Sequence, residues 1–127
     1  MPTPTDRWFE QAQYDLDTAL AMLRSGRYLY VLFCCQQAVE KMLKGLVIKK
    51  TGEFPPRVHN LMRLAEAAGL TLDGSRADFL GELSAYYIQS RYPEEIEAMS
   101  VQITREIASD AFGKTEEMLK WLKSAQL

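Results

Sequence analysis

Apolar residues recur every three or four positions along most of the chain, which is the spacing of one face of an α-helix. The first such stripe follows a helix start, since Thr3 can cap, Pro4 suits the first helical position and Asp6 faces the positive end of the helix dipole. The stripe itself comprises Trp8, Phe9, Ala12, Leu16, Ala19, Leu20 and Leu23. Gly26 is predicted to end this helix, because glycine readily adopts the conformation that follows a helix terminus.

The segment from Tyr28 to about Lys50 is the most apolar part of the chain. Its first eight residues, YLYVLFCC, would suit a buried strand as well as a helix. The helical spacing continues as far as Val47, so we predict one helix of roughly 33 Å. Because its first half is apolar on nearly every side, this helix lies either in the middle of a bundle or in a dimer interface, and both remain open. One polar face of the helix carries Gln36, Glu40 and Lys44.

Two further helices are predicted after the break made by Gly52 and the Pro55-Pro56 pair. The first is short and ends at Gly69. Its inward residues are Leu61, Leu64, Ala65 and Ala68. The second follows a turn at residues 73–75 and ends by about Arg91, because Pro93 keeps the preceding residue out of the helical region. Its apolar residues are Phe79, Leu80, Leu83, Tyr86 and Tyr87.

The last predicted helix begins at Thr104, which can cap it, after an acidic stretch expected to be irregular. Its apolar face comprises Ile107, Ala111, Met118 and Leu122. Residues 1–127 are therefore predicted to form a single all-α domain. The expected architecture is an antiparallel up-and-down bundle of four longer helices plus one short helix.

Composition narrows the classes of protein to consider. Of 127 residues, 47% are hydrophobic and 25% are charged, values typical of a globular domain and wrong for a disordered chain. The formal net charge of -2 excludes a polycationic nucleic-acid binder, so any contact with nucleic acid needs a local basic patch. Basic residues predominate from 40 to 66, and acidic residues predominate from 94 to 117.

Cysteine usage and the N-terminal sequence indicate a cytoplasmic protein. The two cysteines, Cys34 and Cys35, are adjacent, and neighbours on a helix diverge too far to form a disulfide easily. Small buried thiols in a reducing compartment are the favoured interpretation. The first residues form no signal peptide, and no apolar stretch reaches the roughly 20 residues that cross a membrane.

Metal and cofactor chemistry finds little support in the sequence. A di-metal carboxylate site in a helical bundle needs Glu-x-x-His pairs, but the one histidine, His59, has Pro56 three positions before it. One histidine and two adjacent cysteines do not supply a zinc site either. The glycines are isolated and form no phosphate-binding loop. We therefore expect no metal and no cofactor.

Three runs of sequence, in this order, resemble the HEPN family, whose name stands for higher eukaryotes and prokaryotes nucleotide-binding. These runs are QQAVEKMLKGLVIKKTG (36–52), PPRVHNLMRL (55–64) and YYIQSRYPEE (86–95). The N-terminal part fits the same pattern, so the resemblance covers nearly the whole chain. It implies a helical bundle that dimerises and is commonly encoded beside a small nucleotidyltransferase in toxin–antitoxin pairs. Many members are metal-independent ribonucleases.

The resemblance also implies where a ribonuclease motif would lie. Those enzymes carry an arginine, a polar residue and, four to six residues after the arginine, a histidine. Arg91 matches the arginine, but Tyr92 and Pro93 follow it and the segment through Glu97 has no histidine. RNA cleavage without metal needs a base and a cation for the developing charge, and here carboxylates stand in place of the base. The chain looks like a branch with an Arg-Tyr-Pro turn that binds a nucleotide or a partner.

The candidate site residues are Arg91, Tyr92, His59, Lys41 and Lys44. Arginine and lysine can contact phosphate, tyrosine can stack on a base, and histidine can donate a proton or contact a nucleotide. Each also has a structural alternative. Arg91 can neutralise the last carbonyls of the preceding helix, and Tyr92 can cover the core. His59, near a helix start after Pro55-Pro56, can be a satisfied structural histidine, and lysines on a helix are usually solvated. Gln36, Gln37 and Glu40 suit buried positions, for example in a dimer seam.

The hypothesis that the sequence favours is a HEPN-type homodimer that binds a nucleotide or a nucleotidyltransferase partner without catalysis. A ribonuclease that uses Arg91 and His59 is the second hypothesis. The third is a purely structural interaction module, which predicts a large apolar face along residues 28–39.

Overall fold

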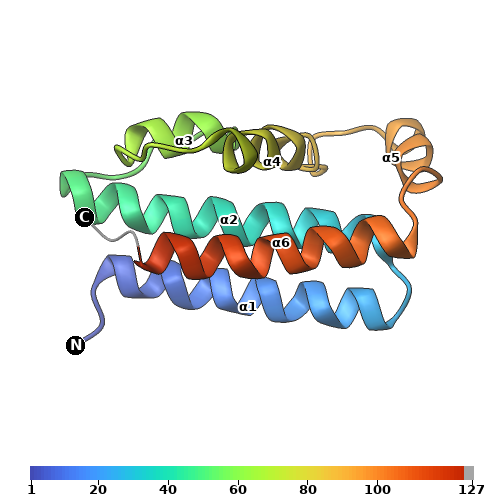
Figure 1. Ribbon diagram of the computed structural model, residues 1–127, viewed down its shortest axis with the longest axis horizontal. Helices are drawn as coiled ribbons and strands as arrows, with labels where there is room; N and C mark the ends of the chain where they lie inside the picture. The colour runs from blue at the N-terminus through green and yellow to red at the C-terminus, as the bar shows by residue number, and fades with distance from the viewer. Residues whose placement is uncertain (125–127) are drawn as a thin grey trace.

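The computed structural model describes residues 1–124, and every regular element among them is a helix, which confirms the all-α prediction (Figure 1). The helices are α1 (Pro4–Arg24), α2 (Tyr28–Thr51), α3 (Leu61–Ala67), α4 (Gly74–Ser84), α5 (Pro93–Ser100) and α6 (Arg105–Ser124). Helices α1, α2 and α6 lie lengthwise beside one another, α3 and α4 follow one another along one side, and α5 lies at one end. With α3 and α4 taken as one rod, the chain runs up, down, up and down.

The ends of α1 and α2 follow from local chemistry. The Thr3 hydroxyl accepts a hydrogen bond from the Asp6 backbone N–H at 3.0 Å, and the Asp6 carboxylate accepts one from the Thr3 backbone N–H at 3.0 Å. These two bonds satisfy donors that a helix start leaves unpaired, and the backbone bond from Thr3 lowers the pKa of Asp6. After α1, Gly26 has a φ of 79°, and after α2, Gly52 has a φ of 73°. Both glycines occupy the left-handed region that other residues avoid.

Helix α2 is the centre of the fold. It packs against α1, α3, α4, α5 and α6, and residues along its whole length are buried. The first half of α2 is buried by the chain's own helices, so of the two positions left open by the sequence it occupies the middle of the bundle. The large apolar face expected along residues 28–39 by the purely structural hypothesis is therefore not exposed. Within that stretch, Tyr30 is the residue that stays exposed.

The structure corrects the sequence predictions between residues 84 and 108. Helix α4 ends at Ser84 rather than near Arg91, and the stretch expected to be irregular contains α5. Pro93 begins α5, where its fixed φ suits the first turn, and the Glu95 carboxylate accepts a hydrogen bond from the Tyr92 N–H at 3.3 Å. Thr104 caps α6 as predicted.

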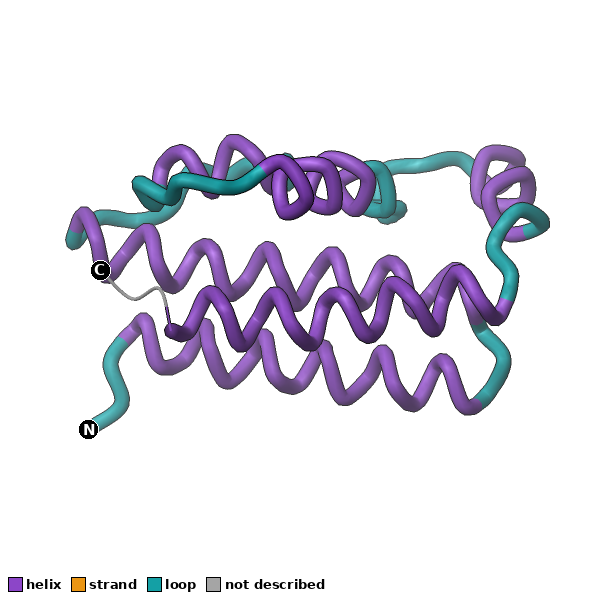
Figure 2. Tube along the Cα trace, viewed as in Figure 1, coloured by secondary structure: helices purple, strands orange, loops and turns teal. Residues whose placement is uncertain are grey.

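The inward face of α6 is also shifted from the prediction. The apolar spacing directs Ile107 toward the core, but this residue is 45% exposed, and Ala108 is buried in its place. Figure 2 shows that the longest loops of the chain flank α3 and α4. These loops carry most of the candidate site residues.

Gly45 allows α1 to lie close against α2. A Cβ atom built at Gly45 would lie 2.7 Å from the Phe9 ring and 3.1 Å from Trp8 Cβ. The Thr5 hydroxyl also donates to the Gly45 carbonyl oxygen at 3.1 Å across the same contact. The glycine within α2 is therefore a packing requirement between the two helices.

Gly45→Ala is expected to lower the free energy of unfolding by about 1–2 kcal/mol, because the clash outweighs the helix propensity gained. Gly113→Ala is the matched control, since it lies within α6 and an added Cβ there meets nothing within 4 Å. The control should raise stability by about 0.5–1 kcal/mol. Urea unfolding of both variants measures the difference. Equal changes of the same sign would contradict the close-packing argument.

Candidate functional site

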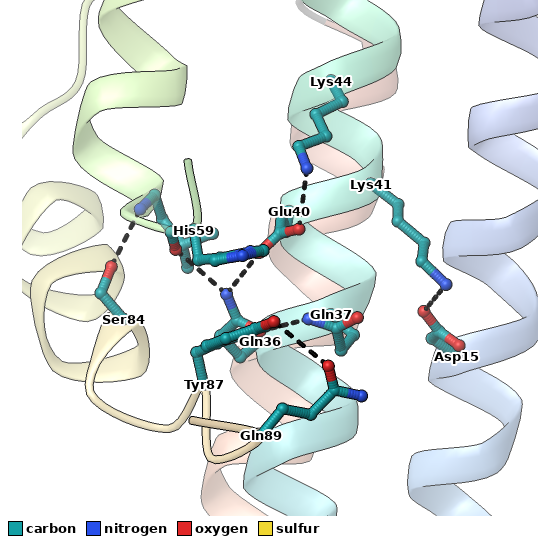
Figure 3. A network of polar contacts seen from close by, with 11 residues as sticks. Asp15, Gln36, Gln37, Glu40, Lys41, Lys44, His59, Ser84, Tyr87 and Gln89 are labelled. Atoms are coloured by element: carbon teal, nitrogen blue, oxygen red, sulfur yellow. Dashed lines mark hydrogen bonds and ion pairs between the residues drawn. The ribbon is translucent and has the colours of Figure 1, made fainter. Parts of the chain in front are cut away.

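A buried polar network lies on the side of α2 that faces α3 and the loop before it (Figure 3). Its central residue is Glu40, whose side chain is 5% exposed. One carboxylate oxygen accepts from Gln36 Nε2 at 2.9 Å, and the other accepts from Lys44 Nζ at 3.0 Å. The three residues meet because positions four apart lie on the same side of a helix. The Gln37 amide adds a bond of 2.8 Å to the Gln36 side-chain oxygen.

His59 reaches this network from the loop between α2 and α3. Its Nδ1 atom lies 3.0 Å from Glu40 Oε1, and its ring stacks on Tyr87 with centroids 3.7 Å apart and planes 9° apart. The imidazole is nevertheless 44% exposed. His59 thus has one nitrogen and one ring face held by the protein, while the rest of the ring reaches solvent.

Hydrogen bonds from α2 and to α4 also hold the backbone around His59. The Gln36 side-chain amide donates to the His59 carbonyl oxygen at 3.1 Å. Two residues later, the Leu61 N–H donates to the Ser84 hydroxyl at 3.0 Å, which ties the start of α3 to the end of α4. Gly52 and the Pro55-Pro56 pair give the loop the turn and stiffness that bring it back along α2. The site is therefore preorganised.

The two candidate lysines have different partners. Lys44 binds Glu40 and also lies 5.6 Å from the centre of the Trp8 ring. Lys41 forms an ion pair with Asp15 of α1 at 2.8 Å, so it links the two long helices. Neither lysine is the solvated side chain that helices usually carry. Only Lys44 belongs to the network around His59.

Arg91 and Tyr92 lie at the far end of the segment that supplies Tyr87. The Arg91 guanidinium donates to the Glu95 carboxylate at 3.1 Å and to the Ala85 carbonyl oxygen at 3.1 Å. Ala85 is the C-terminal cap of α4. Arg91 therefore has the structural role predicted as its alternative, because it satisfies a carbonyl oxygen at the end of that helix. Tyr92 is 72% exposed, so the alternative that it covers the core is wrong.

Residues 85–91 connect the two parts of the candidate site. Tyr87 in this segment stacks on His59, and Arg91 holds the backbone at its start. Sequence reasoning missed Tyr87 as a site residue and gave Glu40 and Gln36 no role beside His59. A carboxylate flanked at four-residue spacing by an amide and an amine was the available signal, because a buried carboxylate needs donors of that kind.

The arrangement leaves the exposed part of the His59 ring able to form a hydrogen bond with a ligand. Among residues 1–124, no group of three or more histidine, cysteine or acidic side chains is placed to hold a metal ion. Burial raises the pKa of Cys34 to about 11 and that of Cys35 to about 12, which favours the protonated thiols at neutral pH. Over the same residues, no helix has the length and apolarity needed to cross a membrane.

Comparisons with known proteins agree on fold and family. The family model described as HEPN domain matches residues 5–125. The crystal structure of TT1696 from Thermus thermophilus has a TM-score of 0.81 and 27% sequence identity, and the match covers 98% of both chains. The crystal structure of ST0689, described as an archaeal HEPN homologue, has a TM-score of 0.70 and 26% identity, covering 97% of this chain and 98% of that one. Among curated proteins, none matches this chain.

Proposed function

The chain belongs to the HEPN family, and we propose that it is a nucleotide-binding module whose ligand contacts His59 and is not cleaved. The observation that carries this proposal is the half-exposed imidazole, held on one side by the buried Glu40 carboxylate and stacked on Tyr87. A side chain fixed in this way loses little freedom on binding, which favours recognition. Tyr92 supplies an exposed aromatic ring on which a base can stack.

The cations near the site support binding rather than cleavage. Cleavage of RNA without a metal requires a positive charge that is available to the developing phosphorane. Lys44 is already paired with Glu40, and Arg91 is already paired with Glu95. Glu94 and Glu97 add further negative charge on α5 beside the Arg91–Glu95 pair. Because Lys44 and Arg91 are each neutralised by a carboxylate, the site is suited to a ligand of modest negative charge.

Titration of the purified protein with ribonucleoside 5′-monophosphates, followed by calorimetry, tests the proposal. His59→Ala is expected to weaken binding by about tenfold or more, because it removes a hydrogen bond and one wall of the site. Tyr14→Ala is the matched control, since it removes an exposed ring of α1 and should leave affinity unchanged. Absence of binding to all four nucleotides, or equal affinity in His59→Ala and the wild type, would refute the proposal.

A second function, that of a metal-independent ribonuclease, has one observation in its favour. A histidine whose Nδ1 faces a carboxylate has the geometry of a general base, and Glu40 provides that carboxylate for His59. Arg91 would then have to leave Glu95 in order to supply the positive charge. Incubating single-stranded RNA with the protein in a chelator distinguishes the two functions. Cleavage that disappears in His59→Ala would replace binding with catalysis as the function.

The partners expected from the sequence form the last part of the proposal. We propose that the chain acts as a homodimer or together with a small nucleotidyltransferase, as in a toxin–antitoxin pair. Exposed apolar side chains near the starts of α2 and α6 support an interface there, because such residues are costly to leave in water. They are Tyr30, Val101 and Ile107. Tyr30 lies in the first turn of α2, Ile107 lies in the first turn of α6 and Val101 directly follows α5, and these parts of the chain lie at the same end of the bundle (Figure 1).

A further inference from the structure

Three hydrogen-bond donors converge on the two oxygens of Glu40. Gln36 Nε2 and His59 Nδ1 share Oε1, at 2.9 and 3.0 Å, and Lys44 Nζ binds Oε2 at 3.0 Å. An ionised carboxylate only accepts hydrogen bonds, and its neighbours here include a charged amine. The atom of His59 that faces Glu40 must therefore carry a hydrogen. In the neutral ring this places the proton on Nδ1 and leaves Nε2 with a lone pair.

We propose that Glu40 is a positioning residue that fixes His59 as the Nδ1–H tautomer, so that Nε2 accepts a hydrogen bond from a ribose hydroxyl of the ligand. The part of this statement that concerns the ligand rests on the proposed nucleotide binding. The assignment of the tautomer rests on the network alone. Gln36 strengthens it, because the same amide that binds Glu40 also binds the His59 carbonyl oxygen and so holds the residue in register.

At about pH 9, where an ordinary imidazole is neutral, the ring distinguishes between the phosphate and the ribose of a nucleotide. Phosphate oxygens present lone pairs, which a lone pair on Nε2 repels. Ribose hydroxyls are donors, and they are the donors that all four ribonucleotides share. With Lys44 engaged by Glu40, the side of the site around His59 is set up to recognise a sugar rather than a phosphate.

The chain offers a direct measurement of the tautomer, because His59 is its only histidine. In a ¹⁵N-labelled sample at about pH 9, where an ordinary imidazole is neutral, a long-range ¹H–¹⁵N spectrum shows which ring nitrogen carries the proton. We expect the proton on Nδ1 in the wild type. A proton found mainly on Nε2 would overturn the proposal. This result needs no variant and no ligand.

Glu40→Gln tests the cause of the tautomer with the smallest change in shape. The new amide has one oxygen for Lys44, Gln36 and His59, and the charged Lys44 amine forms the strongest hydrogen bond to it. The NH₂ group then faces His59, so Nδ1 must accept and the proton moves toward Nε2. Glu95→Gln is the control, because Glu95 binds Arg91 and not His59. An unchanged spectrum in Glu40→Gln would show that Glu40 does not set the tautomer.

Ligand selectivity tests the second half of the proposal. At about pH 9, a 2′,3′-dideoxynucleoside 5′-monophosphate is expected to bind the wild type roughly tenfold more weakly than its ribonucleoside counterpart, as the loss of one hydrogen bond implies. In Glu40→Gln this difference should disappear. Equal affinity of the wild type for the two ligands would overturn the role of the hydroxyl while leaving nucleotide binding intact. No affinity for either ligand would overturn both, whatever the spectrum shows.

Discussion

Glu40→Ala is expected to lower the free energy of unfolding by about 3–5 kcal/mol, the cost of breaking a buried ion pair from one side. The substitution leaves Lys44, whose side chain is 12% exposed, without its carboxylate. It also leaves the Gln36 amide and His59 Nδ1 without their shared acceptor. Gln36 is fully buried and Lys44 is nearly so, and water therefore does not readily replace the bonds that these two side chains lose.

Denaturant unfolding followed by circular dichroism measures this loss. The matched control is Asp110→Ala, which breaks the Asp110–Lys114 pair of α6 at the same four-residue spacing and a distance of 3.0 Å. Those two side chains are 65% and 54% exposed, so water compensates and stability should stay within experimental error. A comparable loss in both variants would mean that burial is not what makes the Glu40 pair important.

Gln36→Ala is expected to cost about 2–4 kcal/mol and to loosen the loop that carries His59. Gln36 is fully buried, and its amide nitrogen serves both Glu40 and the His59 carbonyl oxygen. Removing it creates a cavity in α2 and frees the backbone of the loop. Amide hydrogen exchange should therefore accelerate in residues 58–61 more than in α1.

The neighbouring Gln37→Ala is the control for this effect. Gln37 is only partly buried, and its amide nitrogen donates to the Gln36 side-chain oxygen. We expect a loss of less than about 1 kcal/mol and unchanged exchange in the loop. If exchange in Gln36→Ala rose uniformly over the whole chain, global destabilisation rather than release of the loop would explain it.

The long helices could be predicted from the sequence because several local signals agree there. For α1, the capping residues, the apolar stripe and Gly26 all indicate the same bounds, which the structure has. The end of α4 could not be predicted, because Tyr86 and Tyr87 continue its apolar spacing and no glycine or proline separates them from Ser84. In the structure Tyr87 lies outside α4 and its ring stacks on His59. Tertiary contacts overrode the local pattern.

The sequence predicts several residues of the candidate site but not how they pair. Each of its residues lies in a segment that the sequence marks, but the pairing of Glu40 with His59 spans 19 positions and a turn of the chain. Periodicity predicts which residues of one helix share a face, and it says nothing about which loop returns to that face. The start of α5 could have been predicted, although we expected that stretch to be irregular, because a proline followed by two glutamates is a typical helix start.

The burial of Gln36 and Glu40 in the central helix means that selection for folding and selection for ligand binding act on different atoms of the site. Both side chains are buried and hold other groups in place, so selection for folding alone preserves them in a descendant that no longer binds anything. His59 differs in part, because Glu40 and Tyr87 hold Nδ1 and one ring face while 44% of the side chain stays exposed. The contacts with Glu40 and Tyr87 serve the fold as well, so among related chains that keep the glutamine and the glutamate it is the solvent-facing part of this ring that only use of the site preserves.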